Sequence, residues 1–274
     1  MSLFEAIVLG VVQGLTEFLP ISSSGHLRIV PAMAGWEDPG AAFTAVIQLG
    51  TMAAVVLYFR GDLLRIARTW LASLRDPSRR RERDARLGWY LILATIPISI
   101  IGLAFSHQIE NGARDLYLIA TMLIVLGIVL LIAERVSRRE RDLDDIRGRD
   151  ALIVGFAQAL ALIPGVSRSG ATISAGLLLG FDRVTAARFS FLLSIPAVVL
   201  SGLYEMRDVI DGSAEGTVGL GPTAVATLLA FISGYVSIAF LLRFLTTHTT
   251  DVFVAYRVVL GVIVLALVGT HTIA

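Results

Sequence analysis

Long apolar stretches recur along this chain, separated by short segments that carry most of its arginine and acidic residues. A membrane-spanning helix needs about 20 predominantly apolar residues. Six stretches approach that length, at residues 41–59, 88–106, 116–133, 186–204, 222–242 and 252–270. The pattern predicts an all-α polytopic membrane protein whose transmembrane helices occupy these ranges.

Two shorter pairs of apolar segments precede the first and the fourth of these stretches, at 3–19 with 26–35 and at 151–163 with 169–180. Each pair is broken at its centre by Pro, Ser and Gly, and its segments are too short for two crossings. Irregular backbone at membrane depth is tolerated only inside protein or beside a water-filled cavity. We therefore expect two re-entrant helical hairpins.

The two broken segments resemble each other. Residues 10–25 align with 155–170 without a gap, and six of the 16 positions are identical: Gly10/Gly155, Gln13/Gln158, Leu15/Leu160, Ser22/Ser167, Ser24/Ser169 and Gly25/Gly170. Broken hydrophobic segments at matching points of two halves indicate a midplane site. We expect two repeats in one membrane bundle, 1–135 with hairpin 1–35 and 150–274 with hairpin 150–180. Each repeat has three spans, a linker at about 134–150 joins them, and the site lies where the two loops meet.

Arginine predicts the orientation, because arginine-rich loops lie on the cytoplasmic side. The segment after the first span holds Arg60, Arg65, Arg68, Arg75, Arg79, Arg80, Arg81, Arg83 and Arg86. The segment after the third holds Arg135, Arg138, Arg139, Arg141, Arg147 and Arg149. The loops at 107–115 and 205–221 hold one arginine each and are expected outside. With three spans per half, the halves then have opposite topology, and hairpin 1–35 enters the membrane from outside.

Composition agrees with a membrane protein. Charged residues make up 16% of the chain, against about 25% in soluble domains, and the mean hydropathy is +0.78. The net charge of +1, with the basic residues in loops, gives no reason to expect a nucleic-acid partner. The chain has no cysteine, which excludes disulfides and thiol chemistry. We expect no cleaved signal peptide before the first hairpin.

The first loop carries candidate catalytic groups. Gln13 and Glu17 share one helix face. An intramembrane carboxylate is functional by default. The alternative is that the Glu17 side chain extends to the membrane interface or makes a hydrogen bond that is only structural. Ser23 lies among hydroxyls at a predicted helix N-terminus, a ready anion site. His26 can move a proton near neutral pH, so a serine with a nearby His and carboxylate matches an activated nucleophile. The alternative is a capping serine and a structural histidine.

The second loop adds a permanent positive charge. Arg168 follows Pro164 and Gly165, and its planar fork matches phosphate oxygens. The alternative is a structural ion pair with Glu17. We expect substrate contacts from Arg168 and from the loop residues Ser22, Ser24, Gly25, Ser167, Ser169, Gly170 and Thr172. This set fits a phosphate ester or diphosphate carried by a lipid, and Glu17 with Gln13 could hold Mg²⁺ or Ca²⁺ with water and substrate oxygens.

The motifs resemble those of the undecaprenyl-diphosphate phosphatase family, also called bacitracin-resistance phosphatases. That family is marked by Glu-or-Gln-x-x-x-Glu, here residues 13–17, and by Ser-Ser-x-Gly-His, here 22–26. Its third motif is Pro-Gly-x-Ser-Arg-Ser-x-x-Thr, here 164–172. The resemblance covers the whole chain, including the stretches 43–51 and 189–196.

The resemblance implies hydrolysis of undecaprenyl diphosphate to the monophosphate lipid carrier, which is recycled for cell-wall synthesis, and it implies bacitracin resistance. It implies a divalent cation, the bacterial cytoplasmic (inner) membrane and a site open to the extracytoplasmic side. Carried over, Ser23 is the nucleophile or its positioning partner, His26 the acid–base group and Arg168 the diphosphate clamp. Glu17 orients the nucleophile or binds metal. The first motif allows Glu or Gln at its first position, and this chain has Gln13 there. This weakens the case for a metal site with two carboxylates.

Three other interpretations remain open on sequence alone. The phosphatidic-acid phosphatase type shares Ser-Gly-His and Ser-Arg elements, but its later histidine is missing, because residues 170–180 contain none. A transporter that flips the lipid phosphate would share the inverted repeat with broken helices, yet it needs no nucleophile. A purely structural membrane protein leaves Glu17 and Arg168 unexplained. The oligomeric state is open as well, a homodimer included.

Overall fold

The computed structural model describes residues 1–105, 115–210 and 219–273, without the side chains of Ala41 and residues 201–210. Within these ranges the regular elements are helical, with one isolated bridge between Arg141 and Phe181. The predicted all-α class is thereby confirmed. Of the outer loops predicted at 107–115 and 205–221, residues 107–114 and 211–218 lie outside the described residues, whereas residues 205–210 are helical rather than loop.

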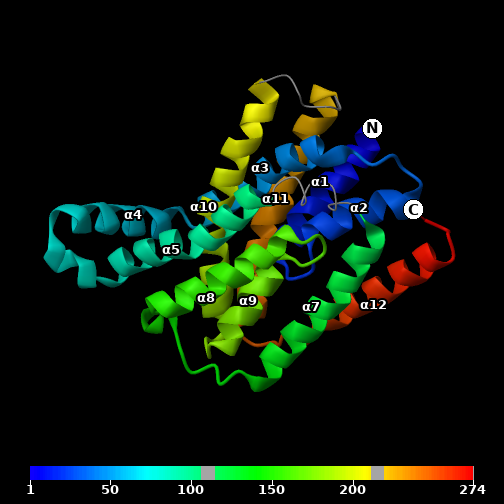
Figure 1. The fold of residues 1–274 in the computed structure, drawn as a ribbon. Coiled ribbons are helices and arrows are strands. Elements are labelled where there is room, and N and C mark those ends of the chain that lie inside the picture. Colours follow the sequence, from blue (N-terminus) through cyan, green and yellow to red (C-terminus); the bar gives the residue numbers. More distant parts are fainter. Residues whose placement is uncertain (106–114, 211–218, 274) are drawn as a thin grey trace.

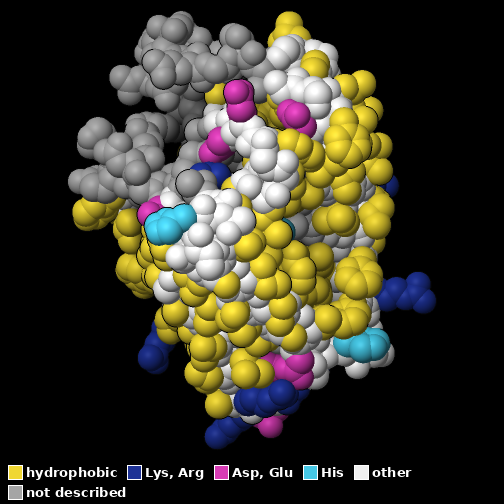
Figure 2. Space-filling view, turned by 90° about the vertical axis from the view of Figure 1, so that its right-hand side faces the viewer, with side chains coloured by type: hydrophobic (Ala, Val, Ile, Leu, Met, Phe, Trp, Pro, Cys, Tyr) yellow, Lys and Arg dark blue, Asp and Glu magenta, His cyan; other side chains and the backbone are white. Residues whose placement is uncertain are grey.

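The six predicted spans correspond to long helices: α3 (Gly40–Tyr58), α5 (Arg83–Ala104), α7 (Leu116–Val136), α10 (Arg183–Ile210), α11 (Leu220–Phe244) and α12 (Asp251–Gly269). Five of them are long and apolar enough to cross a bilayer in the described part of the chain, and α3 joins them as part of a bent pair with the helix that follows. This is a multi-pass membrane protein. Figure 2 shows the apolar belt on one face, with charged side chains at its lower and upper ends.

The two broken segments form helical pairs, as predicted. The first pair is α1 (Leu3–Phe18) and α2 (Ser23–Ala34), and the second is α8 (Gly148–Ala159), the short η3 (Leu160–Leu162) and α9 (Arg168–Leu178). At 1.5 Å per residue, α1 is about 24 Å long and the others are shorter, less than a hydrocarbon core of about 30 Å. Each pair is therefore too short to cross twice. The opposite orientation of the repeats stays a prediction.

The arginine-rich segment after the first span forms α4 (Arg60–Arg75) and η1 (Pro77–Arg81), where we expected a loop. Apolar residues recur there at helical spacing and pack on α5, as when the Trp70 ring meets the Trp89 ring edge-on at 5.4 Å. Gly88 makes room for this contact, because a Cβ there would lie 3.0 Å from Trp70. The α4 axis is bent by 74° from α3, and Figure 1 shows α4 and α5 extending together from the bundle.

Each hairpin packs against a helix of the other half. Helix α1 lies on α11 and α8 lies on α5. The aligned glycines make both contacts: a Cβ at Gly10 would lie 2.4 Å from the Ala226 carbonyl oxygen, and one at Gly155 would lie 2.4 Å from that of Ala94. Small residues let membrane helices approach this closely. Because each hairpin packs on a helix of the other half, the two hairpin breaks meet in the centre of the molecule.

Candidate active site at the meeting of the two hairpin loops

Both hairpin loops enter their second helix through a serine in a left-handed conformation. Ser22 has φ 76° and ψ 95°, and the aligned Ser167 has φ 70° and ψ 116°. Each serine caps the following helix, because its Oγ accepts a hydrogen bond from the N–H of Gly25 (3.4 Å) or Gly170 (3.1 Å). Positive φ is costly for residues other than glycine and clusters at functional sites. The two loops therefore share one strained cap geometry.

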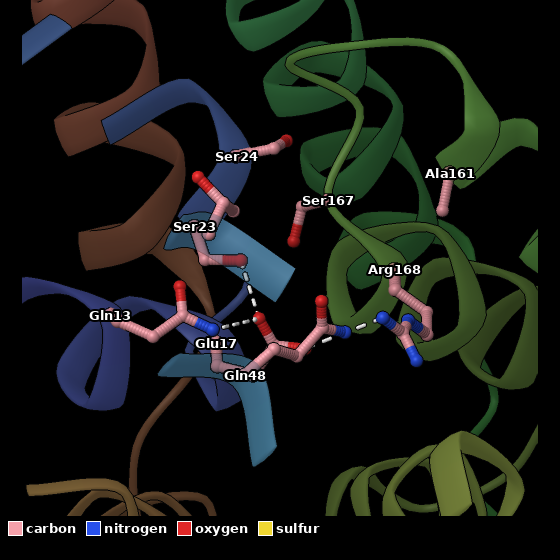
Figure 3. Close-up of a pocket in the computed structure, with 9 residues that line it drawn as sticks. Gln13, Glu17, Ser23, Ser24, Gln48, Ala161, Ser167 and Arg168 are labelled. Atoms are coloured by element: carbon pink, nitrogen blue, oxygen red, sulfur yellow. Dashed lines mark hydrogen bonds and ion pairs between the residues drawn. The ribbon is translucent and has the colours of Figure 1, made fainter. Parts of the chain in front are cut away.

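Glu17, near the end of α1, connects the two loops (Figure 3). Its Oε2 accepts hydrogen bonds from Ser23 Oγ at 2.5 Å and from Gln13 Nε2 at 3.2 Å. Its Oε1 pairs with the Arg168 guanidinium at 3.4 Å. A hydroxyl that donates to a carboxylate keeps its lone pairs free, and the carboxylate is placed to take its proton. The arrangement can therefore activate Ser23 as a nucleophile.

These groups line one pocket. Its walls come from α1, α2, α3 and the second loop, through Gln13, Glu17, Ser23, Ser24, Thr44, Gln48, Ala161, Ser167 and Arg168. The first turns of α2 and α9 add N–H groups that have no acceptor within their own helix, together with two positive dipole ends. The predicted meeting of the two loops is thus present, and the pocket combines a carboxylate, a guanidinium and several hydroxyls.

Two smaller hollows continue from Glu17, one between α9 and α10 and the other between α3 and α10. One is lined by Phe18, Arg168, Ser169, Ser190, Phe191 and Ser194. The other is lined mostly by apolar side chains, with Met52 and Val55 from α3 and Ile195 and Val198 from α10. The surroundings of Glu17 therefore change from polar to apolar in the direction of these two helices.

His26 is not among the residues that line the pocket, although it follows Ser23 closely in sequence. It is 5% exposed, and its Nδ1 donates to the Ser22 carbonyl oxygen at 2.7 Å. Its Nε2 is 2.7 Å from the Tyr256 hydroxyl, and the two rings stack with centroids 5.5 Å apart. The structure does not bring His26 together with Glu17, so its acid–base role stays a prediction.

The remaining predicted residues divide between the pocket and its frame. Ser24 lines the pocket, and its Oγ is 3.3 Å from that of Ser22. Ser169 joins the hairpins, because its Oγ donates to the Leu19 carbonyl oxygen at 3.0 Å. Thr172 is buried, with its hydroxyl 2.6 Å from that of Ser190 and 2.8 Å from the Arg168 carbonyl oxygen.

The pocket offers few oxygen ligands for a divalent cation. Gln13 Oε1 is buried and finds no hydrogen-bond partner among the described residues, and it lies on the same helix face as the Glu17 carboxylate. Within the described ranges no group of three or more His, Cys, Asp or Glu could hold a metal. Mg²⁺ is often held by one or two protein carboxylates with substrate phosphates and water completing its shell, so Gln13 and Glu17 fit a substrate-assisted site.

Sequence reasoning missed three residues around the pocket. Thr44 and Gln48 line it from α3, and Figure 3 shows Gln48 beside Glu17. Arg257 on α12 is fully buried behind both loops. All three lie inside predicted spans, at 41–59 and 252–270, where strongly polar or charged residues such as Gln48 and Arg257 are exceptional and mark functional positions. Polar residues within apolar stretches were therefore the signal by which the sequence could have pointed to them.

Comparisons with known proteins agree with these motifs. A sequence model of the family described as bacitracin resistance protein BacA matches residues 6–263. An undecaprenyl-diphosphatase of Nocardioides sp. is 54% identical over 270 residues, which covers 98% of both chains. One of Thermobifida fusca is 55% identical over 269 residues, covering 98% of this chain and 91% of the relative. One of Mycolicibacterium smegmatis is 54% identical over 275 residues, covering 100% and 99%.

Proposed function

This chain belongs to the family of bacitracin resistance protein BacA, and we propose that it is an integral membrane phosphatase that hydrolyses undecaprenyl diphosphate. The products are undecaprenyl phosphate and inorganic phosphate. Full-length relatives that bear the name undecaprenyl-diphosphatase support the substrate. In this role the protein recycles the lipid carrier for cell-wall synthesis and confers bacitracin resistance.

The observation that carries the proposal is the contact between Ser23 and Glu17 beside Arg168, in a pocket formed by both hairpin loops. A nucleophile next to a base and a fixed cation is the set that phosphoryl transfer needs, because catalysis there is mostly positioning and charge stabilisation. The hollows that lead to apolar side chains of α3 and α10 suit a substrate whose other end is a lipid.

In the proposed mechanism, Ser23 Oγ attacks the terminal phosphorus while its proton passes to Glu17. The bond from that phosphorus to the bridging oxygen breaks, and undecaprenyl phosphate leaves with the electron pair. Water then cleaves the phosphoserine, which releases inorganic phosphate and restores the Ser23 hydroxyl. Arg168 and the N-termini of α2 and α9 hold the phosphate oxygens. We assign the proton transfer to Glu17, because Glu17 contacts Ser23 and His26 faces Tyr256.

Gln13 and Glu17 are the groups that would hold a divalent cation, Mg²⁺ or Ca²⁺. When bound, such a cation would offset the charge of the diphosphate. The measurement is phosphate release by purified protein before and after treatment with a chelator. We expect the activity to be lost on chelation and restored by adding either ion.

We further propose that the protein lies in the bacterial cytoplasmic (inner) membrane with its site open to the extracytoplasmic side. The arginine-rich segments support this orientation, because such segments are expected on the cytoplasmic side, where α4 and the linker after α7 would then lie. The bilayer and the polyprenyl diphosphate are its expected partners. Whether it forms a homodimer is decided by its mass in detergent.

A flippase is the competing function, because broken helices in repeats are a transporter architecture. Phosphate release in detergent separates the two, since flipping cannot occur without a bilayer. We expect purified protein to release phosphate from undecaprenyl diphosphate, and we expect Ser23→Ala to abolish the release. Binding of the lipid without phosphate release by the unaltered protein would contradict the phosphatase and favour the flippase.

A further inference from the structure

Arg257, in α12, is a buried cation at the centre of the molecule. Its side chain is 0% exposed. In the described part of the chain, its hydrogen bonds all go to main-chain carbonyl oxygens. They are Leu123 (3.0 Å) and Met122 (3.2 Å) of α7, Pro20 (3.1 Å) of the first loop, and Gly165 (3.1 Å) and Val166 (3.1 Å) of the second loop. One guanidinium thus joins three separate segments.

The carbonyls that it binds occupy equivalent places in the two hairpins. Pro20 and Gly165 are aligned positions of the sequence repeat, and each precedes a capping serine, Ser22 or Ser167, by two residues. Gly165 has φ +87°, and a Cβ there would lie 2.5 Å from the Ile119 carbonyl oxygen, so the second loop is pressed against α7 beside the guanidinium. Arg257 therefore binds both loops immediately before the helices that carry the reactive groups.

A buried charge is costly unless hydrogen bonds or a partner compensate it. Here carbonyl dipoles compensate it, and the planar fork of arginine suits this task, because its donors point in several fixed directions at once. The guanidinium also lies directly behind the first turn of α9, since a Cβ at Gly170 would be 3.0 Å from its Nη1 atom. Arg257 is not among the residues that line the pocket, so it would act through the loops.

We propose that Arg257 is a positioning residue that locks the two hairpin loops in register, so that Ser23 and Glu17 of one meet Arg168 of the other. This inference rests on the proposed phosphatase function. Ser23 follows Pro20 by three residues, and Arg168 follows Val166 by two, so a shift of either loop moves a reactive group. The Arg168 to Glu17 distance is already 3.4 Å, and a small further separation breaks the pair.

The distance between the loops tests the proposal without any activity. Because the chain has no cysteine, spin labels can be placed only on α2 and α9, through Met33→Cys (51% exposed) and Leu178→Cys (53% exposed). Electron–electron double resonance in detergent should give one narrow distance distribution with Arg257 present, and a broader or shifted one in Arg257→Lys. Lysine keeps the charge but cannot bridge carbonyls of three segments.

Arg183→Lys is the matched control. Arg183 binds the buried Glu134, so this variant also weakens a buried arginine contact while leaving the loops alone. An unchanged distribution in Arg257→Lys would overturn the proposal. If Arg257→Lys does not fold, the labelled protein with Arg257 intact still decides it, because a broad distribution there would show that the loops are not locked.

Kinetics supply the second readout. Misplacing reactive groups by about 1 Å can cost roughly a hundredfold in rate. We therefore expect kcat per folded Arg257→Lys molecule to fall by about that factor, with KM little changed, while Arg183→Lys keeps its kcat and loses thermal stability. If Arg257→Lys were less stable but kept the kcat of the unaltered protein, Arg257 would have a purely structural role. If the unaltered protein releases no phosphate, the proposed function fails, while the label distances still test the lock.

Discussion

Glu17→Gln isolates the contribution of the pocket carboxylate. Glutamine has nearly the same shape, so it removes the negative charge and the proton acceptor while disturbing the packing little. In the native pocket Glu17 accepts the hydrogen bond of Ser23 at 2.5 Å and pairs with Arg168 at 3.4 Å. The substitution therefore affects the nucleophile and the phosphate clamp in opposite ways, and the two kinetic constants separate these effects.

The expected loss is in kcat. A positioned general base is typically worth about 10²–10⁴-fold, or roughly 3–5 kcal/mol of activation free energy at 1.36 kcal/mol per factor of ten. With the divalent cation at a saturating concentration, so that weaker cation binding by the altered site does not limit the rate, KM should stay level or fall, because Arg168 loses its internal partner and one negative charge no longer repels the diphosphate. A phosphate-release assay on purified protein, over a range of lipid concentrations in mixed micelles, measures both constants.

Glu134→Gln makes the same chemical change away from the pocket. Glu134 is buried at the end of α7 and binds Arg183 and Thr250. Removing one partner of such a pair destabilises a protein by about 3–5 kcal/mol, so this control should melt at a lower temperature with its kcat retained. If Glu17→Gln kept an activity close to that of the unaltered protein, Glu17 would not be the base and the reasoning would be refuted.

Three further predictions concern other parts of the site and the topology. Arg168→Lys keeps the charge but loses the planar fork, so kcat/KM should fall at least about tenfold, or about 1.4 kcal/mol; near-normal turnover would reduce Arg168 to a structural ion pair. Ser24→Ala should impair phosphate release less than Ser23→Ala, because Ser24 does not contact Glu17, and equal losses would argue against Ser23 as the attacking group. In sealed cells a cysteine at Leu220, which is 90% exposed, should react with an impermeant reagent, whereas one at Ser78 should react only after the membrane is opened. Equal labelling at both positions would overturn the predicted orientation.

The sequence was sufficient for the broken helices and for the meeting of their two loops. Apolar periodicity located the spans, and the repeated break at Pro, Ser and Gly located the two loops, because both signals are local. The α4 helix escaped prediction for a physical reason. Its arginines indicated a solvated loop, whereas its apolar residues pack on α5 at helical spacing, as Trp70 does on Trp89.

Contacts between distant segments could not be predicted. His26 stands close to Ser23 in the chain, yet its ring stacks on Tyr256, which lies 230 residues away. Arg257 binds both loops from another helix, and only the packing of α12 against α7 puts it there. Gln48 likewise lies in a stretch of mostly apolar sequence, and its place in the pocket depends on how α3 meets α1.

Trapping the covalent intermediate tests the central claim most directly. Purified protein would be quenched during turnover of undecaprenyl diphosphate, in acid and in parallel in base, then digested and mapped by mass spectrometry. The mechanism predicts an acid-stable phosphate on Ser23, absent from Ser23→Ala and much reduced in Glu17→Gln. A base-stable, acid-labile phosphate on His26 would contradict it, and so would the absence of any phosphorylated residue during turnover.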